Sequence, residues 1–188
     1  MTDIKYDSVI LMGQTGCGKG TQSALLAKEL GYEIFSTGDK SREYAAMDTP
    51  LGRVIARMHT VGWIPEWLAS YLMTKALLED FAHQGLVFES VARKLPEAEK
   101  LHEIHESIER SYVVIYMECH DDIVRERQLA RGREGYDNPE NVARRMKAFE
   151  DETLASLSFF SDKGKVIKIN ADEPIEDVFE SIMVELKK

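Results

Sequence analysis

The ten residues GQTGCGKGTQ (13–22) combine four glycines with a lysine and two threonines. Gly13 to Lys19 fit the spacing G-x-x-x-x-G-K, between an apolar run and a segment with helical periodicity. Glycines let the backbone curl so that several N–H groups point at one anion, and the following helix adds its dipole and unpaired amides. Lys19 can reach outer phosphates, and a hydroxyl at the helix start can bind Mg²⁺. The stretch predicts a phosphate-binding loop, with a ligand-free glycine-rich turn as the alternative.

Arginines are concentrated in one short part of the sequence, because six of the eleven fall between Arg125 and Arg145. The formal net charge of −9 disfavours nucleic acid and anionic membranes as partners over most of the surface. Arg127 and Arg131 are four residues apart, so on a helix they share one face and repel each other. An anionic ligand would offset that repulsion, because the planar guanidinium binds phosphate oxygens in pairs. The window predicts a local anion site, and a solvated basic face paired with nearby glutamates is the alternative.

Short apolar segments alternate with helical patterns along the chain. Strands are expected at 8–12, 32–36, 86–89, 112–119 and 165–170. Helices are expected from near Thr21 to Gly31, as two or three segments between 38 and 82, and around 97–109, 120–131, 139–159 and 174–187. This alternation is typical of an α/β domain with a parallel sheet and helices on both faces, whose ligand lies beyond the carboxyl ends of the strands. The glycine loop, STGD (36–39) and residues 89–93 each follow a strand, so we expect one shared site.

Composition limits the remaining classes. The chain has 188 residues, 44% hydrophobic and 30% charged, which suits one globular domain. Its two cysteines, Cys17 and Cys119, can build neither a disulfide scaffold nor a four-cysteine zinc site. The polar N-terminus and the absence of long apolar runs predict a cytoplasmic protein without a membrane partner. His102 and His105 are three residues apart, and we expect them on an exposed helix face rather than in a metal site.

The fuller pattern G-x-x-G-x-G-K-G-T-Q at 13–22 is narrower than that of a general phosphate loop. It resembles the adenylate kinase and nucleoside-monophosphate kinase family of P-loop kinases. The resemblance continues in order through STGDKSR (36–42), GWIPE (62–66), RKLPEAEKL (93–101), RQLARGR (127–133) and DNPENVARRM (137–146). It implies a three-layer P-loop fold with a five-stranded parallel sheet. It also implies a monomer that transfers the γ-phosphoryl group of ATP to AMP, or to another nucleoside monophosphate, with Mg²⁺ as cofactor.

The resemblance further implies a role for individual residues. The expected ATP-binding residues are Gly13, Gly16, Cys17, Gly18, Lys19, Gly20, Thr21, Arg127 and Arg131, with Cys17 as a small filler residue. The expected monophosphate-binding residues are Thr37, Gly38, Arg42, Ile64, Ser90, Arg93, Glu97 and Arg145. The expected catalytic residues are Lys19, Arg93, Arg131 and Arg145, and Thr21 and Glu89 would hold Mg²⁺, partly through water.

The resemblance also implies one kinase domain over 1–188. Its core would comprise 1–36, 67–130 and 139–188, with a monophosphate-binding insert at about 37–66 and a short lid loop at about 131–138. Two alternatives remain open. One is a P-loop kinase for another small metabolite that uses Asp39 as a base. The other is an ATP-binding regulatory protein with weak transferase activity.

The chain departs from the family at 89–93, where it reads ESVAR instead of Asp-Gly-Phe-Pro-Arg. Glu89 is longer than the family's Mg²⁺-ordering aspartate, and Ala92 replaces a proline whose cis bond is therefore in doubt. The lid reads Glu134, Gly135, Tyr136 and Asp137 instead of Arg-x-Asp-Asp, so one arginine is absent at the aligned position.

Glu97 stands where the family has glutamine. A carboxylate only accepts hydrogen bonds, so it can pair with an exocyclic amine, as on adenine or cytosine, and guanine offers two adjacent donors. Adenine is the leading prediction. The alternative is a carboxylate that simply faces the dipole at the start of a helix.

Overall fold

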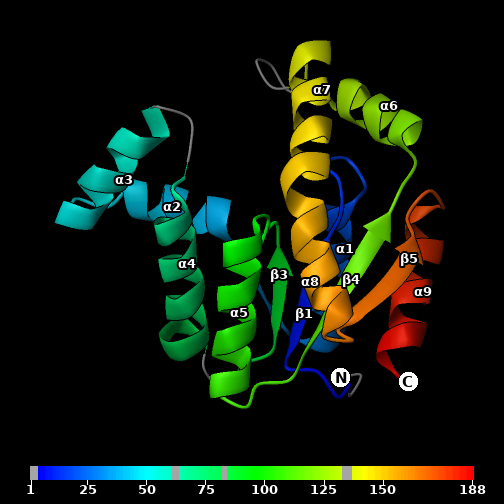
Figure 1. Ribbon diagram of the computed structural model, residues 1–188, viewed down its shortest axis with the longest axis horizontal. Helices are drawn as coiled ribbons and strands as arrows, with labels where there is room; N and C mark the ends of the chain where they lie inside the picture. The colour runs from blue at the N-terminus through cyan, green and yellow to red at the C-terminus, as the bar shows by residue number, and fades with distance from the viewer. Residues whose placement is uncertain (1–3, 61–63, 82–83, 133–136) are drawn as a thin grey trace.

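The computed structural model describes residues 4–60, 64–81, 84–132 and 137–188 (Figure 1). Five strands form one sheet in the order β2-β3-β1-β4-β5, and every neighbouring pair is parallel. Their bounds are β1 (Ser8–Met12), β2 (Glu33–Ser36), β3 (Leu86–Glu89), β4 (Tyr112–Glu118) and β5 (Val166–Asn170). The predicted fold class, an α/β protein with a five-stranded parallel sheet, is confirmed.

The apolar run of β1 reflects its central place in the sheet. All five of its residues are buried, because β3 and β4 pair with its two edges and helices cover both of its faces. Ile10 and Met12 pack in one core cluster, while Val9 and Leu11 pack in the other. Burying a side chain of this size stabilises the fold by about 1.5–3 kcal/mol. This strand therefore fixes the position of the glycine loop that follows it.

Helices cover the two faces of the sheet as separate layers (Figure 1). On one face lie α1 (Lys19–Leu30) and α9 (Ile175–Leu186), whose Leu26 and Ile182 are fully buried in the cluster with Val9. On the other face lie α4 (Glu66–Lys75), α5 (Leu95–Ser107) and α8 (Leu154–Asp162), and they pack on Ile10 and its neighbours. In the described ranges, no helix is both long enough and apolar enough to span a membrane.

Four further helices lie near the carboxyl ends of the strands (Figure 1). On one side are α2 (Thr37–Ala45) and α3 (Pro50–Thr60), and on the other are α6 (Asp121–Arg131) and α7 (Pro139–Ala148). The segment predicted to hold two or three helices thus contains α2, α3 and α4, followed by a π-helical turn, η1 (Ala76–Asp80). Two prolines start helices here, since Pro50 opens α3 and Pro139 opens α7.

Two predicted helix boundaries are wrong. Helix α1 begins at Lys19, not near Thr21, because Gly18 is its N-cap in a left-handed conformation with φ 101°. The helix expected over 139–159 is divided by a π-helical turn, η2 (Phe149–Thr153), and α8 continues to Asp162. The buried residues of α7 join the α1 and α9 cluster, whereas those of α8 join the opposite cluster. The π turn accommodates this change of buried face.

The expectation that His102 and His105 lie on an exposed face is also wrong. His105 is fully buried, with its ring 4.7 Å from that of Tyr112 and 6.0 Å from that of Phe88. His102 Nδ1 is 2.7 Å from the hydroxyl oxygen of Tyr112. Helix α5 is packed between the sheet, α4 and α8, and both histidines lie on its covered side.

Candidate active site

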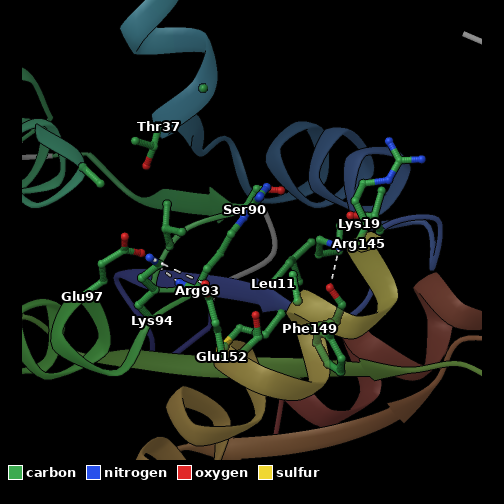
Figure 2. A pocket seen from close by; sticks show the side chains of 18 of the residues that line it. Leu11, Lys19, Thr37, Ser90, Arg93, Lys94, Glu97, Arg145, Phe149 and Glu152 are labelled. Atoms are coloured by element: carbon green, nitrogen blue, oxygen red, sulfur yellow. Dashed lines mark hydrogen bonds and ion pairs between the residues drawn. The ribbon is translucent and has the colours of Figure 1, made fainter. Parts of the chain in front are cut away.

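A cavity of about 480 Å³ opens at the carboxyl ends of the strands (Figure 2). Its walls come from the β1–α1 loop, the start of α2, the β3–α5 segment and the α7–η2 segment. Among the predicted site residues, it is lined by Gly13, Lys19, Thr37, Gly38, Ile64, Ser90, Arg93, Glu97 and Arg145. The glycine loop, the start of α2 and the β3–α5 segment, which were expected to share one site, therefore line one cavity.

The glycine loop packs too tightly for side chains at two of its positions. A Cβ on Gly13 would lie 2.6 Å from the carbonyl oxygen of Met117 and 2.8 Å from Cys17 Sγ. A Cβ on Gly16 would lie 2.8 Å from Gln128 Cγ. Both residues also have φ in the left-handed region, at 148° and 101°, where a side chain is strained. Cys17 is 1% exposed and fills the space beside Gly13, as the filler role requires.

Lys19 is held by the loop that precedes it. Its Nζ donates to the carbonyl oxygens of Gly13 at 2.7 Å and Gln14 at 2.8 Å. A third, weak contact at 3.8 Å reaches Cys17 Sγ. Burial lowers the pKa of Lys19, and Arg93 acts in the same direction, while Glu89 opposes it. A phosphate oxygen in place of the sulfur contact would complete the three donor positions of the ammonium group.

Glu89 ends β3 beside the glycine loop, with one carboxylate oxygen 3.3 Å from the point where a Cβ on Gly20 would lie. Burial raises the pKa of its carboxyl group, Lys19 lowers it, and Asp39 raises it further. Glu89 thus lies near the ammonium of Lys19, and Asp39 lies near Glu89. No cluster of three or more metal-ligating side chains occurs among the residues that the structure describes. Mg²⁺ binds through one or two carboxylates together with substrate phosphates, so this donor set fits a nucleotide-bound Mg²⁺.

Asp137 connects two of the predicted arginines, and sequence reasoning gave it no role. Its side chain is 0% exposed. Its carboxylate accepts hydrogen bonds from Nε and Nη2 of Arg131, each at 3.0 Å, and from Nη2 of Arg145 at 3.0 Å. Arg131 ends α6 and Arg145 lies in α7, so the carboxylate joins these two helices. Residues 133–136 of the predicted lid lie outside the described residues.

Two other predicted arginines are bound to protein groups away from the cavity wall. Arg127 donates to the carbonyl oxygens of Ala171 at 2.8 Å and Asp172 at 3.0 Å, across the turn between β5 and α9. Arg42 forms an ion pair with Asp39 on the exposed side of α2. Neither arginine is among the residues that line the cavity, and neither is Thr21, which is exposed.

The β3–α5 segment has an unusual backbone. Ser90 and Ala92 both have positive φ, at 59° and 51°, although neither is glycine. Such conformations cost of order 1 kcal/mol or more and occur often at functional sites. Among the described residues there is no cis peptide bond, so the bond before Ala92 is trans. The segment places Ser90, Val91 and Arg93 on the cavity wall.

Several wall residues were not predicted, and three of them come from the π-helical turn η2. Ala148, Phe149, Glu152 and Thr153 all line the cavity from α7 and η2. Glu152 is 3.8 Å from Lys94 Nζ, which joins this wall to the start of α5. A regular 3.6-residue periodicity contains no signal for a π turn, so the sequence did not indicate which face of this segment meets the site.

Comparison with known proteins agrees with this geometry. A family model described as adenylate kinase matches residues 11–165. The chain is 31% identical over 172 residues to adenylate kinase 1 of Nostoc sp., which covers 90% of this chain and 93% of the relative. It is 33% identical over 173 residues to the adenylate kinase of Corynebacterium diphtheriae, covering 90% and 93%. It is also 33% identical over 185 residues to probable UMP-CMP kinase 1 of Arabidopsis thaliana, covering 96% and 88%.

The family model spans most of the chain, including the glycine loop, the β3–α5 segment and both arginines bound to Asp137. The relatives match along nearly their whole length. With the parallel sheet and the phosphate loop in place, the chain belongs to the adenylate kinase family.

Proposed function

We propose that this chain is a nucleoside-monophosphate kinase that transfers the γ-phosphoryl group of ATP to AMP, with other monophosphates as possible acceptors. One observation carries the proposal. Lys19 of the phosphate loop lines the same cavity as Arg93 and Arg145, which come from the β3–α5 segment and α7. Three cations from separate elements in one cavity, on a chain with net charge −9, suit two polyanionic substrates held close together.

The chemistry requires positioning and charge neutralisation more than proton transfer. The accepting phosphate oxygen is already ionised near neutral pH, so a general base is not needed. Lys19 would hold the phosphates of ATP on the loop, and Arg93 would hold the acceptor phosphate in line with the γ-phosphorus. Arg145, oriented by Asp137, would stabilise the charge on the group in transfer. Arg131, bound to the same carboxylate, would act on the donor side.

Mg²⁺ is the cofactor that this function implies. When bound, it neutralises charge on the phosphate oxygens of the nucleotide. Glu89, beside Gly20 and Lys19, would hold it partly through water, and the hydroxyl of Thr21 would be its other protein ligand. Arg42 and Arg127 would contact the acceptor phosphate and the donor base only after their present partners are released.

Water must be excluded while the phosphoryl group moves. We propose that the segment 37–66 closes over the acceptor and that 131–138 is the lid over ATP. The position of α2 and α3 on one side of the strand ends, and of α6 and α7 on the other, supports this division. We also propose, from the resemblance to the family, that the enzyme acts as a monomer.

The test is ADP formation from Mg-ATP and AMP, followed by chromatography. We expect ADP from AMP with the parent chain and a loss of at least about 100-fold in kcat/KM for Lys19→Met, because a donor to the transferring phosphate is removed. Lys28→Met is the control, since Lys28 lies in the last turn of the same helix. No turnover of any monophosphate, or equal rates for the parent and Lys19→Met, contradicts the proposal.

A further inference from the structure

A buried glutamine packs against the glycine loop from outside the cavity. Gln128 of α6 is 0% exposed, and a Cβ on Gly16 would lie 2.8 Å from its Cγ and 3.6 Å from its Cδ. Gly13, Thr15 and Lys19 of the loop line the cavity, whereas Gln128 is not among the lining residues. The amide of Gln128 therefore contacts the loop from behind, on the side of α6.

The amide of Gln128 is an exception among buried polar groups. Neither its Nε2 nor its Oε1 has a hydrogen-bond partner among the residues that the structure describes. Most buried polar atoms in folded proteins are paired, because an unpaired atom loses its hydrogen bonds to water without replacement. An apolar side chain here would continue the buried face of α6 that carries Val124, one turn earlier. Packing alone therefore does not explain a glutamine at this position.

The glycine loop is attached to α6 at more than one point. Gln14 Nε2 donates to Asp121 Oδ1 at 2.7 Å, in the first turn of α6. Gly16 lies against Gln128, two turns further along the same helix. Arg131, which ends α6, follows three residues later. A group that fixes the loop against α6 therefore acts on the phosphate-binding backbone without entering the cavity.

The geometry of a phosphate loop indicates what this amide would meet. In a trans peptide unit the N–H and the C=O point in opposite directions. When N–H groups of the loop turn toward a phosphate, the carbonyl oxygens of the same peptide units turn away from it, into the protein. Such carbonyl oxygens need donors, because buried backbone groups are almost always paired. The NH₂ group of Gln128 is a buried donor beside Gly16.

Resting on the proposed function, we propose that Gln128 is a positioning residue for the phosphate loop, and that its amide donates to a loop carbonyl oxygen when the phosphates of ATP are bound. The contact turns an unpaired amide into a hydrogen-bonded one, so its free energy adds to the affinity for the phosphates. Gln128 itself touches no substrate. Loss of its amide should therefore weaken nucleotide binding without weakening the fold of the protein in the absence of nucleotide.

The experiment uses Gln128→Met, which keeps an unbranched side chain of similar length and removes both polar atoms. In urea denaturation without nucleotide, the free energy of unfolding should equal or exceed that of the parent, because two unpaired buried atoms are removed. In calorimetric titration, the Kd for ATP should rise by about 5- to 10-fold, the size of one hydrogen bond. The Kd for inorganic triphosphate should rise by the same factor, since the contact depends on the phosphates. The KM for AMP should stay within about twofold.

Ser156→Ala is the matched control. Ser156 of α8 is also 0% exposed, and its Oγ has no hydrogen-bond partner within the described ranges. Its replacement likewise removes an unpaired buried atom, but α8 packs in the core cluster on the opposite face of the sheet from that of Val124. The control should match or exceed the parent in stability and should keep the parent's Kd for ATP.

A Kd for ATP in Gln128→Met within about twofold of the parent value overturns this inference. A parallel fall in stability and in ATP affinity also overturns it, because Gln128 would then serve packing alone. In either case the kinase proposal stands if the parent converts AMP to ADP. A parent chain that binds no ATP overturns both.

The parent chain supplies a second measurement that needs no variant. Followed by NMR, the side-chain NH₂ of Gln128 should exchange with solvent at least about 10-fold more slowly with ATP than without it, because it gains a hydrogen bond. Equal exchange rates in the two conditions overturn the inference, whatever the variants show.

Discussion

Asp137 fixes the orientation of two arginines of the candidate site. Its carboxylate is fully buried and accepts three hydrogen bonds from Arg131 and Arg145. A buried carboxylate is stable only when such partners compensate its desolvation. In return it fixes two long side chains that would otherwise sample many rotamers. The residue thus links the stability of the α6–α7 region to the position of two arginines that we propose bind phosphate.

We expect Asp137→Asn to reduce both the stability of the α6–α7 region and the ordering of Arg131 and Arg145. The neutral amide turns an N–H group toward one arginine, so the free energy of unfolding should fall by about 1–3 kcal/mol. Because Arg145 loses its orientation, kcat should fall more than KM changes. Urea denaturation and steady-state kinetics measure these effects. Asp122→Asn is the control, since Asp122 is 96% exposed and 3.6 Å from Arg125, and it should change stability by less than about 1 kcal/mol.

His105 gives the fold a predictable response to acid. It is buried, its Nδ1 is 2.8 Å from the carbonyl oxygen of Leu101, and burial lowers its pKa to about 4. In the unfolded chain the pKa is near 6.5, so between pH 6.5 and 4 the unfolded state binds a proton that the folded state does not. At pH 5 the free energy of unfolding should be lower than at pH 7 by about 2 kcal/mol through this group alone.

The comparison of urea denaturation at pH 7 and pH 5, for the parent and for His105→Phe, isolates this contribution. The variant removes the titrating group and keeps a ring between Phe88 and Tyr112. Its stability should therefore depend less on pH over that interval. Parallel pH profiles for the two proteins would mean that His105 is not the group responsible.

The sequence identified residues that belong to short motifs. It did not identify residues that act by orienting other side chains. Lys19 and Arg93 were found because a glycine loop and a strand end place them at the carboxyl edge of the sheet. Asp137 was not, because its importance depends on how close two helices bring Arg131 and Arg145. Nor could sequence alone show that Arg93 N–H orients the Glu97 carboxylate.

At the level of elements, the glycine loop is packed against β4 and α6 as closely as a core segment. Gly13 faces the backbone of Met117, and Gly16 faces Gln128 of α6. The loop keeps its shape because its neighbours leave no alternative space. A Cβ added to Gly13 must displace the carbonyl oxygen of Met117, a backbone atom that cannot move like the end of a flexible side chain.

We therefore expect Gly13→Ala to weaken ATP binding by at least about tenfold and to lower the free energy of unfolding by more than about 1 kcal/mol. Calorimetric titration with ATP and chemical denaturation provide the two measurements. Gly164→Ala is the matched control. Gly164 also has a positive φ, 67°, but a Cβ there meets nothing within 4 Å, so it should lose stability through backbone strain and keep its ATP affinity.

The sequence predicted the strands better than the helices that follow the arginine window. The three inner strands β1, β3 and β4 contain continuous apolar runs, and burial on both faces of a parallel sheet produces that pattern, whereas the edge strands β2 and β5 also carry polar residues. The segment 139–162 contains one uninterrupted periodic signal, although it folds as α7, η2 and α8. The π turn becomes apparent only from the packing, because the buried residues of α7 and those of α8 belong to core clusters on opposite faces of the sheet.

At the scale of the whole molecule, a ligand that occupies both the donor part and the acceptor part of the cavity should stabilise the folded protein. We expect a dinucleotide with two adenosines joined by five phosphates to stabilise the protein by about 2.7 kcal/mol at 100 times its Kd. For a chain of this size that corresponds to a rise of about 5–10 °C in Tm. Scanning calorimetry with this ligand, and with AMP alone as the comparison, measures the effect. A rise no greater than that produced by AMP would contradict a cavity that holds both nucleotides.

The order of the strands in the sheet also affects how the chain acquires its structure. Ser8 pairs with Leu86 on one side and with Tyr112 on the other. The two strands that pair with β1 are therefore synthesised much later than β1 itself. Contacts between residues so distant in sequence form slowly, because a long segment must first be brought into a closed loop. On the ribosome, the glycine loop therefore acquires its final shape only after β4 has emerged, and the apolar N-terminal strand remains unpaired at least until β3 has emerged.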